Sequence, residues 1–433
     1  MKEQLFFKEA FSIIGCAVIL IRHLLWGMVM FITIFKETYK KIIRNKKNRL
    51  IFILAIIGIV LYSVLVVSGN ENVLTIDKAQ LELETYAEYG QKESRLDSGD
   101  IAVNSFTGVD TYSMAKREYE ANFAFHKAIG EGDMKRLVDL QNSGIPSFQA
   151  EALNEYLDDK YIGDFVMKNF ERSVIFRQMS ALGELDSVDA HAYNGQTAAQ
   201  QLHAAITGFG PLIILFITIF VASDILTDDR KHRTIKSGQP LGFRTYIFYQ
   251  SVTVFLVMLA ATAVLTSLFI LITGVLYGLG DLSMNVTQYA YQDGARGGEL
   301  NYTDIPLGTF LAYGGVLTVM LIYLFVRINA ALSLVSRHDI VVMILGFLLI
   351  AFNRIYSGGG EAEILGIPAH YFPQNYFEYG NVLSGLQNYL TMSDQFTFMN
   401  GVFVIAGTVI VTEIFIYLLV FWMHRQKFER AVG

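Results

Sequence analysis

The sequence is poor in cysteine and in charge. Cys16 is the single cysteine among 433 residues, so the chain forms no intramolecular disulfide and no cysteine-based metal site. Charged residues make up 17% of the chain and hydrophobic residues 53%, whereas soluble domains average about 25% charged residues. This shortage of charge favours a membrane protein over two or three soluble domains.

Common catalytic and nucleotide-binding motifs are also missing. The sequence contains no GxxxxGK[ST] phosphate-binding loop, no HExxH zinc motif and no GxSxG nucleophile motif. His126, His191 and His203 are scattered without metal-ligand spacing. We therefore expect no catalytic site, no metal and no cofactor on this chain, and nothing in its composition indicates a nucleic-acid partner.

Long apolar runs recur along the chain, each close to the roughly 20 residues that a helix needs to cross a bilayer. They are residues 50–68, 206–225, 246–278, 307–332, 340–356 and 402–423. The third run exceeds this length, so we expect its outer end to project beyond the membrane or to break at Gly274. The sequence predicts an all-α fold, a polytopic membrane helix bundle of six spans.

A basic segment precedes the first span and indicates the orientation of the bundle. Residues 1–49 form an N-terminal interfacial or elbow segment, and positive charge next to a span marks the cytoplasmic side. The tail HRQKFER is also basic, so we expect both termini in the cytoplasm of a bacterial-type plasma membrane. Residues 10–35 are apolar but contain Arg22 and His23, which leaves both a span and an interfacial helix open. The basic residues expected at the membrane surface are Lys40, Lys41, Arg44, Lys46 and Lys47.

Residues 69–205 are polar and acidic, which is tolerated outside the cell. Apolar residues recur there at three- and four-residue spacing, so we expect a compact helical extracytoplasmic domain with turns at Gly99, Gly144 and Pro146. Its aromatic and Met side chains either line a ligand cleft or form a core, and helical spacing favours the core. Residues 206–433 are then a five-span membrane domain with an outer loop at 357–399.

Two ionisable residues fall inside or beside the predicted spans. Glu413 lies in the last span and Arg327 lies near an inner boundary. An intramembrane carboxylate serves either as an ion-coupling group or as a partner within the bundle. We favour pairing within the bundle, which leaves the energy for any transport outside this chain.

The loop at 223–246 carries a family resemblance. Its stretch TDDRKHRTIKSGQPLGFR resembles the loop between the second and third membrane helices of type-2 ABC exporter permeases, where an acidic pair, a Gly-Thr or similar pair, a proline and an arginine recur in that order. Arg233 stands where glycine is usual. In that family the loop docks on a separate ATPase, and the residues that the resemblance assigns to docking are Asp228, Asp229, Arg230, Arg233, Thr234, Lys236, Pro240 and Arg244.

The resemblance implies a permease subunit that exports an amphipathic peptide, lipid-linked molecule or drug across the cell membrane. Its partners would be cytoplasmic ABC ATPase subunits that hold ATP and Mg, and a second permease in a homodimer or heterodimer. The alternative function is a membrane-anchored receptor or immunity protein whose outer domain binds a peptide or toxin without ATP coupling.

Overall fold

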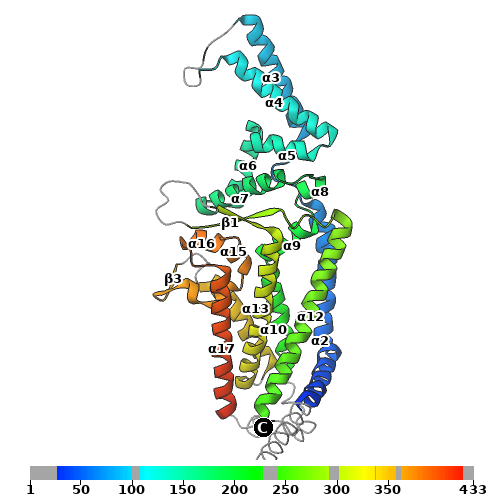
Figure 1. Ribbon diagram of the computed structural model, residues 1–433, viewed down its shortest axis with the longest axis vertical. Helices are drawn as coiled ribbons and strands as arrows, with labels where there is room; N and C mark the ends of the chain where they lie inside the picture. Colours follow the sequence, from blue (N-terminus) through cyan, green and yellow to red (C-terminus); the bar gives the residue numbers. More distant parts are fainter. Residues whose placement is uncertain are drawn as a thin grey trace, which may run out of the picture.

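The protein is elongated, with long helices at one end and a helical domain at the other (Figure 1). The computed structural model describes residues 27–99, 103, 108–225, 227, 242–291, 302–336, 338–356 and 362–422. These residues are mostly helical, as expected for an all-α membrane protein.

The bundle consists of long apolar helices. They are α2 (Lys46–Leu61), which continues as η1 (Tyr62–Val66) and η2 (Val67–Gly69), α10 (Gly210–Ala222), α12 (Phe243–Tyr277), α13 (Leu307–Val335), α14 (Asp339–Tyr356) and α17 (Phe398–Trp422). Four helices in the described part of the chain are long and apolar enough to cross a membrane, and a bent pair makes a fifth. The structure therefore supports four to five spans by length and composition, and it does not confirm the six predicted.

The predicted span at 206–225 is bent rather than straight. Helix α9 (Ala198–Thr207) ends before Gly208, and the stretch Ala190–Thr207 meets α10 at an angle of 68°. A Cβ atom on Gly210 would lie 2.4 Å from the carbonyl oxygen of Ala205, so only glycine permits this approach. Pro211 occupies the first turn of α10, where its missing N–H costs no hydrogen bond.

Helix α12 runs without interruption past Gly274. The amide of Gly278 donates a 3.0 Å hydrogen bond to the carbonyl of Gly274, and the helix ends where Gly278 adopts a φ of 88°. The expected alternative of a break at Gly274 is wrong, because the helical hydrogen bond there is intact.

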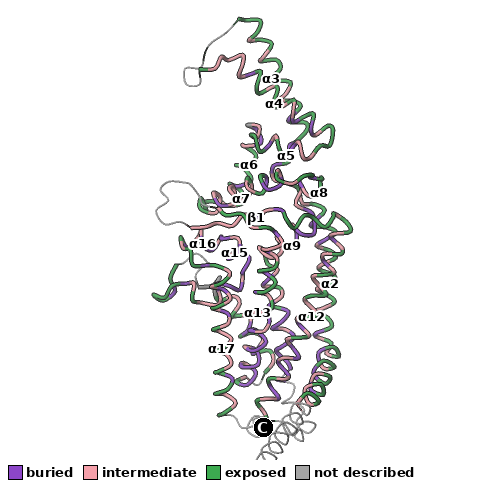
Figure 2. Tube along the Cα trace, viewed as in Figure 1, coloured by how far each residue is buried: buried purple, intermediate pink, exposed green. Residues whose placement is uncertain are grey.

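Helix α13 lies at the centre of the bundle (Figure 2). Leu317, Leu321 and Phe325 on this helix are fully buried, in a core shared with α10 and α17. In an 18-residue apolar stretch of α13, 44% of the residues are buried. In the corresponding stretches of α2 with its continuation, of α12 and of α17, 11% of the residues are buried. Those three helices consequently turn most of their apolar surface outward, as helices in contact with lipid do.

The outer domain contains α3 (Lys78–Ser98), α4 (Thr111–Glu131), α5 (Met134–Ser143), α6 (Ser147–Lys160), α7 (Phe165–Gly183) and α8 (Ala190–Tyr193). Its core includes Leu74, Leu137 and Leu157. The hairpin of α3 and α4 projects from the rest (Figure 1), so the prediction of a compact domain is wrong for this part.

The predicted turn residues of the outer domain lie at helix ends. Gly99 follows α3 with a φ of 63°, and Gly144 follows α5. Pro146 immediately precedes α6, where its fixed φ suits a helix start. These turn predictions are confirmed.

Within the described residues, two small hairpins depart from a purely helical fold. Strand β1 (Asn285–Tyr289) pairs antiparallel with β2 (Tyr302–Pro306), and β3 (Glu363–Ile364) pairs with β4 (Ile367–Pro368). Arg177 of α7 lies 3.6 Å from Asp304, so the first hairpin links the outer domain to α13. Four short helices precede α17, namely η4 (Ala369–Tyr371), η5 (Pro373–Tyr376), α15 (Tyr379–Leu383) and α16 (Leu386–Thr391).

Candidate ligand-binding site

A cavity of about 440 Å³ lies where the outer domain meets the bundle. Its volume falls within the range of small-molecule sites, roughly 300–1,000 Å³. The polar lining residues are Asn70, Glu71, Asn72, Tyr156, Glu171, Gln178, Tyr193, Asn194, Gln200, Gln201 and His203. The apolar lining residues include Val73, Ile175, Met179, Leu182, Met284, Val286 and Leu307. We call it the outer cavity.

Helix α9 forms one wall of the outer cavity and is held at its N-terminus by the end of α12. The amides of Ala198 and Ala199 each donate a 3.0 Å hydrogen bond, to the carbonyls of Gly278 and Leu279 respectively. These bonds satisfy two of the N–H groups that every helix leaves unpaired in its first turn. The position of this wall therefore depends on α12, far along the chain.

Glutamine side chains on α9 are held by hydrogen bonds to the outer domain. Gln200 donates from Nε2 to the carbonyl of Ala192 at 3.0 Å, and Gln201 donates from Nε2 to the carbonyl of Gly195 at 2.7 Å. On the same helix, the ring of His203 packs against Phe310 of α13, with centroids 4.6 Å apart. The polar wall of the cavity is consequently preorganised.

The outer cavity has an acidic character. Among the described residues no Lys or Arg lines it, whereas Glu71 and Glu171 do. Glu171 also accepts a 2.6 Å hydrogen bond from Lys160. Burial lowers the pKa of Lys160, but the hydrogen bond and charge of Glu171 outweigh it, so that pKa is raised and Lys160 stays cationic. The site favours a neutral or positively charged ligand.

A second cavity of about 700 Å³ lies on the opposite side of α9, between α2, α10 and α12. Ala204 lines both cavities. Tyr62, in the π-helical turn η1, donates a 3.1 Å hydrogen bond from its hydroxyl to Oε1 of Gln201. Helix α9 is thus a shared wall, and its polar face is tied directly to the first membrane helix. We call this second space the membrane cavity.

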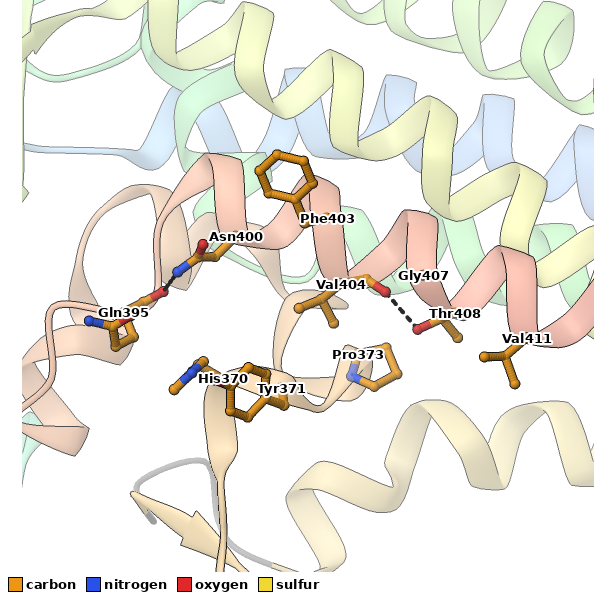
Figure 3. A pocket seen from close by; sticks show the side chains of 10 residues that line it. All are labelled: His370, Tyr371, Pro373, Gln395, Asn400, Phe403, Val404, Gly407, Thr408 and Val411. Atoms are coloured by element: carbon orange, nitrogen blue, oxygen red, sulfur yellow. Dashed lines mark hydrogen bonds between the residues drawn. The ribbon is translucent and has the colours of Figure 1, made fainter.

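A third hollow, of about 620 Å³, lies beside the outer end of α17 (Figure 3). His370 and Asn400 line its polar end, and Phe403, Gly407 and Val411 continue it along α17. Asn400 donates from Nδ2 to the carbonyl of Gln395 at 2.7 Å. Its lining comes from α17 and the segment just before it, so it does not connect the outer domain with the bundle.

Arg327 and Glu413 form a bidentate ion pair inside the bundle. The guanidinium donates from Nε and Nη2 to the two carboxylate oxygens at 2.5 and 2.6 Å, and Arg327 is 2% exposed. The hydroxyl of Tyr323 donates to the same carboxylate at 3.2 Å. The expectation that Glu413 pairs within the bundle is confirmed, and the pair holds α13 against α17.

Most residues predicted for the loop at 223–246 lie outside the described residues. These are Asp228, Asp229, Arg230, Arg233, Thr234, Lys236 and Pro240. Arg244 is described, in the first turn of α12, and its guanidinium lies 4.5 Å from the ring centroid of Tyr417. This contact joins α12 to α17.

The predicted membrane-surface residues lie on two helices that meet at Asn45. Residues 27–44 are helical, and Lys40 and Arg44 there are exposed, as is Lys46 at the start of α2, while Lys41 is half-buried. Lys47 lies 3.3 Å from the carboxylate of Asp224. The sequence did not indicate this partner, because the two residues are far apart along the chain. Most of residues 10–35 lie outside the described residues.

Comparison with known protein families matches residues 165–287 to the serpentine type 7TM GPCR chemoreceptor Srz family. This segment runs from α7 through α10 and α12 to β1, and it covers less than half of the chain. Most of the residues that line the outer cavity fall within it. No curated protein and no solved structure matches the chain.

This match corrects the exporter interpretation. The family found is a receptor family, not a type-2 ABC permease family, and it contradicts the predicted export function, the ATPase subunits and the second permease. The misleading signal was a few separated residues in one charged loop, an arrangement that many cytoplasmic loops can meet. Among the expected partners the lipid bilayer remains.

Sequence reasoning also missed Tyr62, Gln200 and Gln201. None belongs to a recognisable motif, and their role arises from contacts between distant segments. One usable signal was present, because the sequence GFGP at 208–211 combines breaking residues within an apolar run. Hydropathy averaged over a window conceals such a break.

Proposed function

We propose that the chain is a multi-pass membrane receptor whose outer cavity binds a small amphipathic ligand without ATP coupling. The observation that carries the proposal is the position of α9, which is a wall of the outer cavity and continues through a 68° bend into α10. The similarity of residues 165–287 to a chemoreceptor family supports it. A ligand that contacts α9 therefore contacts a helix that is joined through the bend to the membrane helix α10.

The chemistry of the outer cavity suggests the class of ligand. Glu71 favours a positive group, whereas the charge of Glu171 is already balanced by Lys160. The amide side chains supply hydrogen bonds, and Met179 and Met284 offer adaptable apolar contacts. The amino-terminal end of a short peptide with an apolar first side chain combines these features. Such a ligand agrees with a receptor for a peptide or for the end of a peptide toxin.

The topology belongs to the same proposal. We count α2, the bent pair α9 and α10, α12, α13, α14 and α17 as six crossings, with α14 a shorter one. In Figure 1 the segment 27–46 lies at the end of the bundle away from the outer domain. This segment carries the exposed basic residues Lys40, Arg44 and Lys46, which supports cytoplasmic termini by the positive-inside rule. The outer domain is then extracytoplasmic.

The binding proposal is tested with the full chain in phosphatidylcholine nanodiscs. The probe is a fluorescent tripeptide with leucine at a free amino terminus, compared with its N-acetylated form, and anisotropy reports binding. Saturable binding of the free-amine form, weakened at least about tenfold by acetylation, is expected, because losing the charge contact costs about 1.4 kcal/mol.

Substitution at the cavity mouth provides the matched control. Gln178 lines the cavity and is exposed, so Gln178→Trp fills the mouth without disturbing the core and should abolish binding. Gln91→Trp makes the same change on the exposed surface of α3 and should leave binding unchanged. Equal binding by both variants would refute a ligand site in the outer cavity.

A further inference from the structure

The membrane cavity is largely apolar, and the hydroxyls of its two tyrosines are already engaged. Its lining includes Phe52, Ala55, Ile59, Ile214, Met258, Leu265 and Phe269. The hydroxyl of Tyr62 bonds to Gln201, and that of Tyr379 lies 2.6 Å from the hydroxyl of Thr318. An occupant therefore meets hydrocarbon surface and gains little from carrying a charge into the cavity.

The membrane cavity opens sideways between α2 and α10. Leu54 on α2 is 52% exposed, and Phe209 and Ile213 beside the bend are 62% and 55% exposed, although all three line the cavity. Gly58 on α2 is also exposed and leaves a gap in that helix surface. These residues lie on helices whose outward surfaces are apolar, so the opening faces the acyl chains of the bilayer.

The contents of such a cavity are constrained by packing. Protein interiors have few voids larger than a water molecule, and the atoms around an empty apolar space lose their dispersion contacts. Water gains little there, because it needs two to four polar partners. The molecule that is present at high concentration at the opening, and that matches its surface, is a lipid acyl chain.

We propose that the membrane cavity is a lipid site, which takes one acyl chain of a membrane phospholipid inserted laterally between α2 and α10. The chain packs against Leu202, Ala205 and Ile206, on the side of α9 opposite the outer cavity. It packs against the bent α9–α10 pair and fills the space that the neighbouring side chains leave empty. The proposal of this lipid site depends on the membrane cavity and its opening, and it does not depend on the proposed receptor function.

The experiment measures retained lipid on the full chain by native mass spectrometry. The protein is purified in detergent and mixed with deuterated dipalmitoyl phosphatidylglycerol, whose mass separates it from cellular lipid. Wild-type protein should retain one labelled lipid. Gly58→Phe places a ring in the opening and should lower the lipid-bound fraction at least about tenfold, a loss equivalent to about 1.4 kcal/mol.

Gly315 provides a matched control on α13. A Cβ atom at Gly58 or at Gly315 meets nothing within 4 Å, so both positions have room for a side chain, but Gly315 lines neither the membrane cavity nor its opening. Gly315→Phe should retain lipid as the wild type does. Thr262→Leu, which reduces the cavity from α12, serves as a second filling variant if Gly58→Phe does not fold.

Two results would overturn the proposal. The first is equal lipid retention in the filling variants and in Gly315→Phe. The second is a wild-type dimer that Gly58→Phe converts to a monomer without changing lipid retention, since a second copy of the chain would then cover the opening. Peptide binding in the outer cavity is measured separately, so either site can fail without the other.

Discussion

Most helices of the outer domain start differently from three long helices of the bundle. The exceptions are α2 of the bundle, which is capped by the side chain of Asn45, and α6 of the outer domain, which follows Pro146 without a side-chain cap. Five outer-domain helices begin after an aspartate whose carboxylate accepts a hydrogen bond from the first turn, and these are Asp77, Asp110, Asp133, Asp164 and Asp189. Helices α10, α12 and α13 instead follow Phe209, Gly242 and Pro306, without a side-chain cap. Helices in water depend on local signals, whereas long apolar helices are stabilised by a bilayer that offers no other hydrogen-bond partner.

The two regions also differ in what they bury. The outer domain buries Leu74, Leu81 and Leu157 and exposes charged residues, as soluble domains do. The bundle exposes apolar residues and buries polar ones, including Arg327 and Asn329. In the bundle, buried polar contacts such as that of Arg327 with Glu413 therefore add to the apolar core in specifying which helices are neighbours, while in the outer domain the apolar core has the main role.

Breaking the buried ion pair should have the largest effect. Arg327→Ala leaves the Glu413 carboxylate without this charged partner, although the hydroxyl of Tyr323 still donates to it. Removal of one member of a fully buried pair costs about 3–5 kcal/mol, and because the Glu413 side chain is 36% exposed we expect the lower end of this range. The lost free energy of unfolding is measured by unfolding the purified protein in mixed micelles that contain increasing amounts of dodecyl sulfate. The double variant Arg327→Met with Glu413→Leu should recover most of it, and failure to recover would mean that the pair also has a role other than neutralising charge.

A cavity in the outer-domain core should have the next largest effect. Leu157 is 0% exposed, so Leu157→Ala should destabilise that domain by about 2–5 kcal/mol. Hydrogen exchange should rise in α5 and α7 while α13 stays protected. Leu83→Ala, at a position 69% exposed, is the control and should change stability by less than about 0.5 kcal/mol. Loss of protection in α13 as well would show that the two regions unfold together.

Removing a helix cap should have a smaller effect that is confined to the outer domain. The carboxylate of Asp164 accepts a 3.0 Å hydrogen bond from the amide of Met167, so Asp164→Ala should cost about 1 kcal/mol. Thermal unfolding measures this cost. Asp97→Ala, the same change at an exposed position in the last turn of α3, should be neutral or slightly stabilising, because an acidic side chain there opposes the helix dipole. Equal shifts for both variants would mean that lost charge, rather than the cap, is responsible.

The smallest expected effect is a dependence of the stability of the first turn of α4 on pH. The amide and hydroxyl of Ser113 donate to Asp110 and lower the pKa of its carboxyl below the usual value. The stabilisation is therefore complete above the ordinary carboxyl pKa and is lost as the pH falls through the lowered one. Hydrogen exchange in the first turn of α4 should quicken in acid beyond its intrinsic pH dependence. Asp110→Asn should remove this dependence, and the first turn of α12, which has no acidic cap, should lack it.

Much of the fold class could be predicted from composition, but not the arrangement of the elements. Long uncharged runs predict membrane helices because each residue contributes separately to the free energy of transfer into the bilayer. The bend at 208–210 and the β1–β2 hairpin were missed. The bend is a local exception within an apolar run. The hairpin lies in a polar, aromatic loop, and the Asp-Gly pair at 293–294 was a turn signal that the sequence reasoning did not use.

The candidate site could be predicted only in part. The helical spacing of aromatic and Met residues allowed for a ligand cleft but favoured a core, and the structure has both, since Met179 belongs to the core and lines the outer cavity. Residues of the outer cavity range from Asn70 to Leu307 along the chain. No spacing rule connects segments so far apart.

The sequence by itself determined that the chain partitions into a membrane, that its elements are mostly helices, and that its outer helices end at glycines such as Gly99. These properties depend on individual residues and their near neighbours. Only the tertiary structure decided that Glu413 pairs with Arg327, 86 residues away, and that α9 separates two cavities. Contacts between distant segments depend on how the whole chain packs, because each requires several helices to be in place at once.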